Sequence, residues 1–285
     1  MKRKNKPVVL VIPDIHGRTF WKKDLEKFPK DKYPKLDIVF LGDYVDPYDF
    51  EGITRIQAIE NFKEIIEIAK EDNRIHLLIG NHDMHYWYDA PYKSRVDNKN
   101  YNKIKDIFLQ NFTLFNVAFD KKIGNKFFLF THAGVSKPWL DHLHNIGEFS
   151  LKTNIGKITE EQKKYCKFLS KIKPIAKDLN KLKLNFQGQA NLWMASYARG
   201  GDYPNGSCIW EDLSEWGFKN MEIPGIWQIF GHSRWSKSDP DDAYINYDRE
   251  FACVDTCSSW IIDYESNIIK ADDYGNEKNI EKDLV

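Results

Sequence analysis

Short apolar runs that end at a polar turn recur along the chain. Each has four or five mostly β-prone residues, a length typical of a strand rather than a helix. The five runs and the polar residues after them are Val8–Ile12 before Asp14 and His16, Ile38–Leu41 before Gly42 and Asp43, Ile75–Ile79 before Gly80, Asn81 and His82, Phe127–Phe130 before Thr131 and His132, and Trp227–Phe230 before Gly231 and His232. We predict a strand at each run.

The runs are continuously apolar and do not alternate, which indicates strands buried on both faces. In sheets of this kind, ligands bind beyond the carboxyl ends of the strands. The five polar endings can therefore converge on one rim.

Helical spacing of apolar residues fills much of the remaining chain. Residues 56–69 carry apolar side chains every three or four positions and predict an amphipathic helix. Residues 101–115 give a weaker pattern of the same kind. Late in the chain, 251–254 and 260–264 look like two strands, and we predict that they pair antiparallel around a turn near Ser258.

A change of character sets off the segment 145–203, which is Lys-rich and helical in pattern. A capping box at Thr159 and Gln162 predicts a helix start, and Pro174 should break or kink the stripe that follows. We interpret the chain as one domain over 1–285 with this segment inserted as a helical cap. A basic face for nucleic acid is the alternative, although Lys-rich helices are usually solvated surface.

Composition limits the class of protein. The chain has 285 residues, 42 basic and 42 acidic, with 42% apolar residues, and is too apolar to be disordered. Zero net charge disfavours broad binding to nucleic acid or membranes, so any anion site must be local. The four cysteines form no C-x-x-C pair, and no apolar stretch approaches a membrane span. We expect reduced thiols and a soluble, cytoplasmic protein.

The polar strand endings supply only nitrogen and oxygen ligands, without thiolate. Such a set suits divalent ions such as Mn, Fe or Zn and differs from a Cys-based structural zinc site. It is also too large for one tetrahedral ion, whereas two ions about 3.5–4 Å apart that share one carboxylate would use it fully. The candidate ligands are Asp14, His16, Asp43, Asn81, His132 and His232.

The same endings spell five motifs in series. They read D-I-H-G from Asp14, G-D-Y-V-D from Gly42, G-N-H-D from Gly80, H-A-G from His132 and G-H from Gly231. In this order they resemble the signature of calcineurin-like metallophosphoesterases, especially the branch of serine/threonine protein phosphatases and diadenosine tetraphosphatases. The resemblance spans Asp14 to His232, most of the chain.

The resemblance implies an α/β fold of two mixed β-sheets packed face to face and flanked by helices. It implies that Asp14 and His16 hold one metal, that Asp43 bridges, and that Asn81, His132 and His232 complete the second. His82 would donate a proton to the leaving oxygen, oriented by Asp46. We expect two divalent ions, Mn²⁺ first, with Fe, Zn, Co or Ni as alternatives.

The expected chemistry is hydrolysis of a phosphorylated substrate. Two divalent ions contribute about +4 and outweigh the charges of Asp14, Asp43 and a bridging hydroxide, which leaves a positive pocket. Coordination lowers the pKa of water toward about 7, so the nucleophile exists at physiological pH. His82, kept protonated by Asp46, would protonate the departing oxygen. We expect direct attack without a covalent enzyme intermediate.

Two departures leave the substrate open. The family's second motif continues with an arginine that grips phosphate, where this chain has Pro47, and its third motif has Glu where this chain has Asp83. Other arginines could replace the missing one, because arginine binds oxyanions bidentately. By their position in the sequence the candidates are Arg18, Arg234 and Arg199, with Arg55 a weaker fourth; Arg3, Arg74, Arg95 and Arg249 lie outside the motifs and are expected at the surface.

Weaker similarities concern the surroundings of the site. Residues 208–212 resemble the Trp-containing stretch before the last His motif of phage-type phosphatases, and 254–256 resemble their closing D-T-G, with Cys257 for Gly. Aromatic residues within 84–88, with Trp193 and Tyr197, form either a substrate pocket or, more simply, core packing. His85 and His76 are expected to be ordinary surface and structural histidines.

The sequence favours a phosphomonoester hydrolase, resembling those that act on phosphoserine or phosphothreonine in proteins. A dinucleoside polyphosphate hydrolase or a phosphodiesterase is the alternative within the enzyme class. A non-catalytic, metal-binding scaffold is the alternative of another class, although the chain keeps the acid histidine and every ligand. The partner of the site would be a phosphoprotein or nucleotide.

Overall fold

The strands form two mixed sheets. The computed structural model describes residues 6–88, 90–153, 158–217, 221–236 and 238–274. The six-stranded sheet contains, in spatial order, β11 (Ile268–Lys270), β10 (Trp260–Asp263), β1 (Pro7–Ile12), β2 (Asp37–Phe40), β3 (Ile75–Leu78) and β4 (Phe115–Asn116). The five-stranded sheet contains β5 (Ala118–Ile123), β6 (Lys126–Thr131), β7 (Ile226–Phe230), β9 (Phe251–Cys253) and β8 (Tyr244–Asn246).

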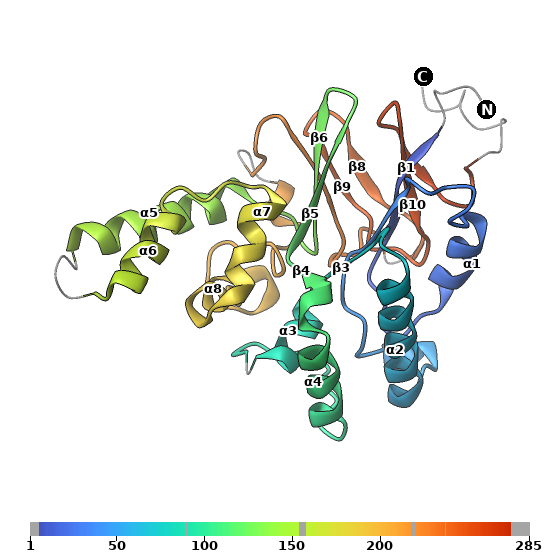
Figure 1. The fold of residues 1–285 in the computed structure, drawn as a ribbon, viewed down its shortest axis with the longest axis horizontal. Coiled ribbons are helices and arrows are strands. Elements are labelled where there is room, and N and C mark those ends of the chain that lie inside the picture. The colour runs from blue at the N-terminus through green and yellow to red at the C-terminus, as the bar shows by residue number, and fades with distance from the viewer. Residues whose placement is uncertain (1–5, 89, 154–157, 218–220, 237, 275–285) are drawn as a thin grey trace.

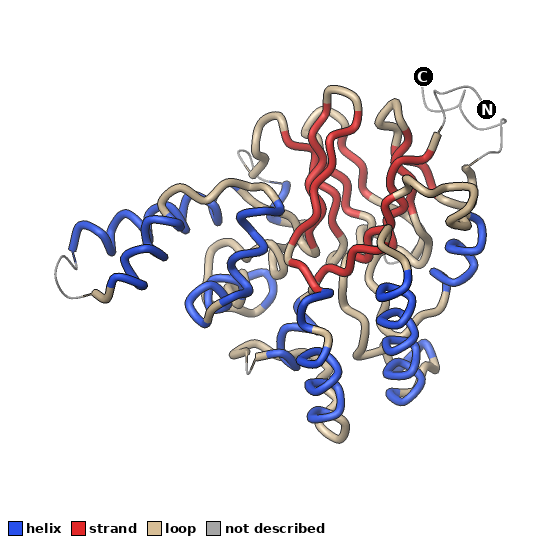
Figure 2. The backbone as a smooth tube through the Cα atoms, in the orientation of Figure 1, coloured by secondary structure: helices blue, strands red, loops and turns tan. Residues whose placement is uncertain are grey.

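Helices surround these strands. They are α1 (Phe20–Lys27), α2 (Arg55–Glu71), α3 (Asn81–Trp87), α4 (Tyr101–Gln110), α5 (Lys137–Thr153), α6 (Glu160–Leu169), α7 (Ala176–Leu179) and α8 (Phe186–Leu192). Short 3₁₀ helices cover Asp49–Glu51, Phe112–Leu114, Asn180–Leu184, Tyr197–Arg199 and Glu215–Gly217. Figure 2 shows the strands at the centre of the molecule with the helices outside them. None of the helices in the described ranges has the length and apolarity that crossing a membrane requires.

The two sheets pack face to face through one buried apolar layer. Val9, Val11 and Val39 of the six-stranded sheet lie in the same cluster as Phe128 and Ile229 of the five-stranded sheet. The neighbouring residues of β1 and β2 point to the other face, because side chains alternate along a strand. This architecture confirms the predicted fold class.

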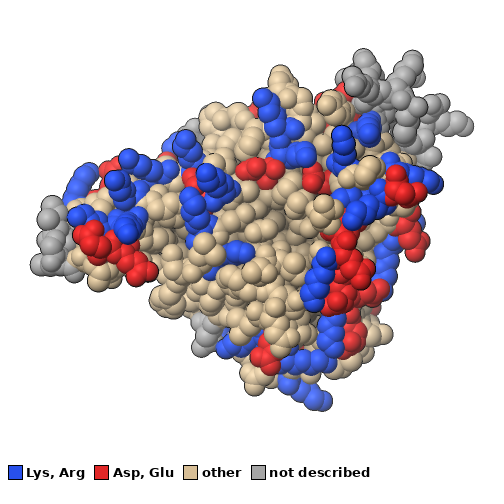
Figure 3. Space-filling model, in the orientation of Figure 1, with Lys and Arg blue, Asp and Glu red and all other residues tan. Residues whose placement is uncertain are grey.

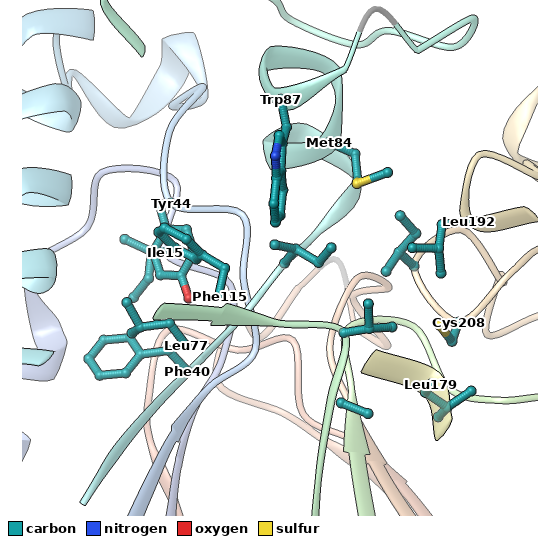
Figure 4. Close-up of a cluster of buried hydrophobic side chains, with 14 of the residues drawn as sticks. Ile15, Phe40, Tyr44, Leu77, Met84, Trp87, Phe115, Leu179, Leu192 and Cys208 are labelled. Atoms are coloured by element: carbon teal, nitrogen blue, oxygen red, sulfur yellow. The ribbon is translucent and has the colours of Figure 1, made fainter. Parts of the chain in front are cut away.

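The outer face of the six-stranded sheet packs against helices. Phe40 of β2 and Leu77 of β3 lie in a second core cluster with Trp87 of α3 (Figure 4). Leu179 of α7 and Leu192 of α8 belong to the same cluster. The later helices therefore share a core with the sandwich and are not an independent layer.

All five predicted strands are present, and their directions explain why their endings meet. β1, β2 and β3 run parallel in one sheet, and β6 and β7 run parallel in the other. Since parallel strands point their carboxyl ends to the same edge, the loops after all five can reach one rim. The helix predicted over 56–69 is confirmed as α2, and Thr54 caps it.

Two predicted elements were wrong. The segments 251–254 and 260–264 do not pair with each other, since β9 pairs with β7 and β8 whereas β10 pairs with β1 and β11. Both strands are buried, and each finds its partners in a different sheet as the chain crosses the sandwich. The helix expected over 101–115 ends at Gln110, and Phe115 instead begins β4.

The Lys-rich segment forms helices, as expected. The capping box at Thr159 opens α6, and no helix runs through Pro174, because α6 ends at Leu169 and α7 begins at Ala176. α5 and α6 extend as a pair away from the sheets (Figure 1). On the face in Figure 3, acidic and basic side chains are interspersed over this end of the molecule. That mixture favours a solvated surface over a continuous basic face.

The α5–α6 pair depends on a close contact at one glycine, which gives a first prediction. A Cβ at Gly147 would lie 2.5 Å from the backbone nitrogen of Ser170 and 2.6 Å from the carbonyl oxygen of Cys166. Gly147→Ala should therefore lower the free energy of unfolding by about 1–3 kcal/mol, although alanine gains about 1 kcal/mol of helix propensity. Thermal melting against the wild type measures the change.

Gly217→Ala is the matched control, because a Cβ there meets nothing within 4 Å. We expect its melting temperature to stay close to that of the wild type. Equal or higher stability of Gly147→Ala would contradict the close packing of the two helices.

Candidate active site

The loops that follow β1, β2, β3, β6 and β7 place six polar side chains in one buried cluster. They contribute, in that order, Asp14 and His16, Asp43, Asn81, His132 and His232. The first five are at most 4% exposed and His232 is partly exposed. Four of the six, His16, Asp43, Asn81 and His232, line one pocket. This pocket has a volume of about 490 Å³, within the usual range for small-molecule sites. The convergence expected from the strand endings is present.

Asp43 lies at the centre of the cluster. Its Oδ2 is 3.5 Å from Nε2 of His16 on one side and 3.5 Å from Nε2 of His132 on the other. Its Oδ1 accepts a hydrogen bond from the backbone N–H of His82 at 2.9 Å. One carboxylate thus faces two imidazoles from different sheets, as a carboxylate shared by two ions must.

The remaining side chains gather around His132. Its Nε2 lies 3.0 Å from Oδ1 of Asn81 and 3.1 Å from Nδ1 of His232. The backbone N–H of His232 donates to both carboxylate oxygens of Asp14 at 3.1 Å. Within the described residues, three groups have ligand atoms within 4.8 Å of one another. Two contain Asp43, one with His16 and His82 and the other with His132 and His232, and the third joins Asp46 to His82 and His85.

Backbone carbonyls fix the orientation of two imidazoles. Nδ1 of His132 lies 2.9 Å from the carbonyl oxygen of Leu41, and Nδ1 of His16 lies 3.1 Å from those of Val45 and Asp46. A carbonyl only accepts, so Nδ1 carries the proton in both rings. Nε2 of each is left with a lone pair directed at Asp43, which is the form that binds metals.

The backbone around the cluster is strained. His16, Asp43, Asp46 and His232 all have positive φ angles, between 45° and 67°. Such conformations cost about 1–3 kcal/mol each in non-glycine residues and concentrate at functional sites. The positive φ angles therefore reduce the stability of the fold, but they direct these side chains toward the cluster.

Two glycines make room for the carboxylates. A Cβ at Gly80 would lie 2.1 Å from Oδ1 of Asp43, and a Cβ at Gly231 would lie 2.1 Å from Oδ1 of Asp14. Asp83 secures the same loops, because its carboxylate accepts hydrogen bonds from the backbone N–H groups of Asp43, Tyr44 and Gly80 at 2.7–3.0 Å. The change from Glu to Asp in the third motif is thus compatible with a tightly held site.

The electrostatics of the cluster fit a divalent cation. Burial raises the pKa values of Asp14 and Asp43 and lowers those of His16 and His232, so the buried site favours neutral groups. Nε2 of His232 is buried without a hydrogen-bond partner. A cation would offset the charge of the carboxylates and give this nitrogen a partner. The donor set is nitrogen and oxygen only, which suits the metals expected from the sequence.

Asp46 organises a second set of polar groups. Its carboxylate accepts from Nδ1 of His82 at 3.0 Å, Nε2 of His85 at 3.0 Å, the Tyr86 hydroxyl at 2.5 Å and Arg55 at 3.1 Å. The expectation of a surface position for His85 was wrong, because this side chain is fully buried. The sequence could not indicate this contact, since it depends on how α3 is oriented.

Burial opposes protonation of His82, and its protonation by virtue of Asp46 stays a prediction. Burial lowers the pKa of His82 to about 4, and the opposing effect of Asp46 does not compensate for it. The hydrogen bond to Asp46 still fixes the ring, and Nε2 is the nitrogen left for the pocket, which His82 lines. An anion bound beside the ring would raise its pKa again.

The arginines expected to bind substrate differ in position. Arg199 lines the pocket and donates from Nη2 to the carbonyl oxygen of His232. Arg18 is buried against Glu51, and Arg234 shares the same carboxylate at 3.4 Å. A role of Arg18 and Arg234 in substrate binding stays a prediction. Arg74, expected at the surface, is buried and held by Asp72, so that expectation was wrong.

Arg95 is the residue that sequence reasoning missed. It was expected at the surface but lines the pocket, with Nη2 3.3 and 3.4 Å from the two ring nitrogens of His16. No motif and no periodic pattern marks the segment that carries it. Its position follows from the path of the loop between α3 and α4.

The residues flagged by weaker similarity lie around the site. Trp210 lines the pocket, with its ring 6.0 Å from that of His232. Asp255 is buried, and the charges of Arg18, Arg199 and Arg234 oppose the effect of burial, which raises its pKa. Cys208 and Cys253 are buried, and all four cysteines are free, as expected.

The aromatic side chains of 84–88 serve mainly the core. Met84, Tyr86 and Trp87 are at most 2% exposed and belong to the cluster beneath the six-stranded sheet. Tyr197 is exposed. His76 donates from Nε2 to Oδ1 of Asp37 at 3.0 Å and stacks on Phe119, which confirms a structural histidine.

Comparison with known proteins agrees with this geometry. The calcineurin-like phosphoesterase family matches the chain over residues 7–233. The chain therefore belongs to this family and is a metal-dependent phosphoester hydrolase, which confirms the resemblance and the enzyme class predicted from the motifs. No curated protein sequence matches it.

Solved structures also match the chain, and we describe one of them. It is a protein serine/threonine phosphatase from Saccharomyces cerevisiae with similarity to human phosphatase PP5, and it is 16% identical. The match covers 94% of this chain and 79% of that one, with a TM-score of 0.42. A likeness of this degree indicates no substrate.

Replacing Asp43 by Asn should abolish metal binding without destabilising the metal-free fold. Burial raises the pKa of Asp43 in the metal-free fold, whereas the same carboxyl group ionises freely in the unfolded chain at neutral pH. The difference lowers the free energy of unfolding of the metal-free protein at this pH. We expect metal-free Asp43→Asn to melt at or above the temperature of the metal-free wild type. Differential scanning calorimetry in a chelating buffer measures this.

Addition of a divalent metal ion should stabilise the wild type more than Asp43→Asn. A divalent ion at about 100 times its Kd stabilises a folded protein by about 2.7 kcal/mol, and we expect this gain for the wild type but not for Asp43→Asn. An equal gain in both proteins would show that Asp43 is no ligand.

Proposed function

We propose that this protein hydrolyses phosphomonoesters at a centre of two divalent ions. Asp14 and His16 would hold one ion, Asn81, His132 and His232 would hold the other, and Asp43 would bridge them. The observation that carries the proposal is the placement of one Asp43 oxygen at 3.5 Å from both His16 and His132. Mn²⁺ is the proposed native ion, because the donor set has no thiolate.

When bound, the two ions would supply positive charge for the phosphoryl oxygens and a water whose pKa is lowered toward neutrality. The chain's own residues do the rest. Arg199 and Trp210 line the pocket that would admit the phosphoryl group. Because water reaches the phosphorus directly, no residue of the protein forms a covalent bond to it.

His82 is the proposed proton donor. Asp46 holds Nδ1, which leaves Nε2 to protonate the oxygen that departs from phosphorus. The phosphoryl anion itself would raise the pKa of the ring above its low value in the empty pocket. Asp46 acts here as a positioning residue.

The proposed substrate is a phosphoserine or phosphothreonine side chain of a protein. A pocket of about 490 Å³ at the rim of the strands accommodates such a side chain, and the helices over 145–203 are proposed to act as a cap beside it. Free cysteines support action in a reducing compartment such as the cytoplasm.

A comparison of model esters tests the reaction class. With Mn²⁺ we expect p-nitrophenyl phosphate to be hydrolysed with a kcat/KM at least tenfold above that of bis-p-nitrophenyl phosphate, because the dianion gains more from a positive pocket. A preference for the diester would replace this proposal with a phosphodiesterase. A panel that adds phosphopeptides and dinucleoside polyphosphates identifies the substrate class.

The leaving group tests the role of His82. His82→Ala should lower kcat by about 10²–10⁴ for a phosphoserine peptide, whose alkoxide needs a proton to leave. The loss should be far smaller for p-nitrophenyl phosphate, because p-nitrophenolate leaves unprotonated. Steady-state kinetics with both substrates measures the difference, and an equal loss with both would contradict proton donation by His82.

A further inference from the structure

Arg95 reaches the pocket from a segment that carries none of the metal-site motifs. It lies on the loop between α3 and α4, and its guanidinium is held over the ring of Tyr48, 3.7 Å from the centroid. Nε donates to the carbonyl oxygen of Asp46 at 3.3 Å, and Nη2 lies 3.4 Å from Nε2 of His16. The charge is thus directed at the nitrogen that would hold an ion.

Arg95 is held in place by its surroundings. Arg55 donates to its carbonyl oxygen while also pairing with Asp46. The backbone of Arg95 has a φ of 49°, a strained value shared with the residues of the candidate metal site. Strain of this kind persists only where neighbouring structure imposes it. The guanidinium is therefore fixed before any substrate arrives.

The charge of Arg95 also lacks the acidic partner that neighbouring arginines have. Glu51 pairs with Arg18 and Arg234, and Asp212 pairs with Arg199 at 2.6 Å. Over the described ranges, no carboxylate forms an ion pair with Arg95, whose contacts are a carbonyl, an imidazole and an aromatic face. A half-buried and unneutralised guanidinium in a pocket attracts an anion.

We propose that Arg95 binds the phosphoryl oxygens of the substrate and so supplies the charge that Pro47 cannot. The proposal rests on the proposed function. A cation held by His16 would repel the guanidinium at this distance unless an anion lay between them. A phosphoryl oxygen removes that repulsion, and a dianionic monoester does so more fully than a monoanionic diester. Arg95 is therefore a specificity-determining residue for monoesters.

Substitution of Arg95 tests the proposal through binding and selectivity together. For Arg95→Ala we expect the KM for p-nitrophenyl phosphate and the Ki of inorganic phosphate to rise about 10–100-fold, the range of a lost charge-assisted hydrogen bond. The KM for bis-p-nitrophenyl phosphate should change less than threefold. Arg95→Lys should restore part of the loss, because it keeps the charge but not the planar fork. Lys122→Ala, on β5, is the control for loss of one positive charge.

Calorimetric titration gives a readout that does not depend on turnover. Inorganic phosphate should bind the Mn²⁺-loaded wild type and bind Arg95→Ala at least tenfold more weakly. Mn²⁺ without phosphate should bind Arg95→Ala as tightly as the wild type, or more tightly, since a repelling charge is gone. Thermal melting checks that each variant folds.

The outcomes separate this inference from the proposed function. The wild-type protein could hydrolyse no ester and yet bind phosphate more tightly than Arg95→Ala does. That result would contradict the proposed function and support the anion site at Arg95. An active wild type whose Arg95→Ala variant keeps its KM and Ki would overturn the role of Arg95 alone. Three other results would also overturn the role of Arg95. They are an equal rise in KM for the monoester and the diester, weaker Mn²⁺ binding by Arg95→Ala, and no phosphate binding by the wild type.

Discussion

The buried carboxylate of Asp43 is the constraint on which the rest of the structure depends. It follows β2 of the six-stranded sheet, yet it faces His132, which follows β6 of the five-stranded sheet. The site therefore exists only while the two sheets stay packed, and the apolar layer between them holds its two halves in register. An anionic group without a full set of donors is costly to bury, so this arrangement indicates a cationic occupant.

The backbone around Asp43 is strained in order to hold its carboxylate in the site. Positive φ angles recur at the strand endings, and glycines stand where any Cβ would strike a carboxylate oxygen. Asp83 compensates locally, because its carboxylate ties three backbone N–H groups of the loops after β2 and β3. Strain at the rim is thus opposed by hydrogen bonds to that rim and by the apolar core beneath it. Stability and chemistry are in competition at these few residues.

The sequence predicted the parts of the site that local rules determine. Each apolar run with its polar ending is a strand followed by a functional turn, so five short segments were enough to assemble Asp14, Asp43 and His132 at one rim. Contacts set by tertiary packing were not predictable. His85 is buried only because α3 presents it to Asp46. β9 and β10 pair in different sheets because both are buried strands with competing partners, and no local pattern decides between them.

The position of Arg95 in the pocket was also not predictable from the sequence. Its charge bears on how a protein without net charge selects an anion. Arg18 and Arg234 share one carboxylate, that of Glu51, and Arg199 pairs with Asp212, so the number of arginines in the sequence says little about the field in the pocket. What counts is the charge left over after pairing. Two divalent ions against Asp14, Asp43 and a bridging hydroxide would leave an excess of about +1, which Arg95 would raise to about +2. A phosphate dianion offsets most of this excess, whereas a monoanionic diester leaves a larger unpaired charge in a poorly solvated site. Selectivity for monoesters would then come from a local imbalance, although the whole chain has equal numbers of acidic and basic residues.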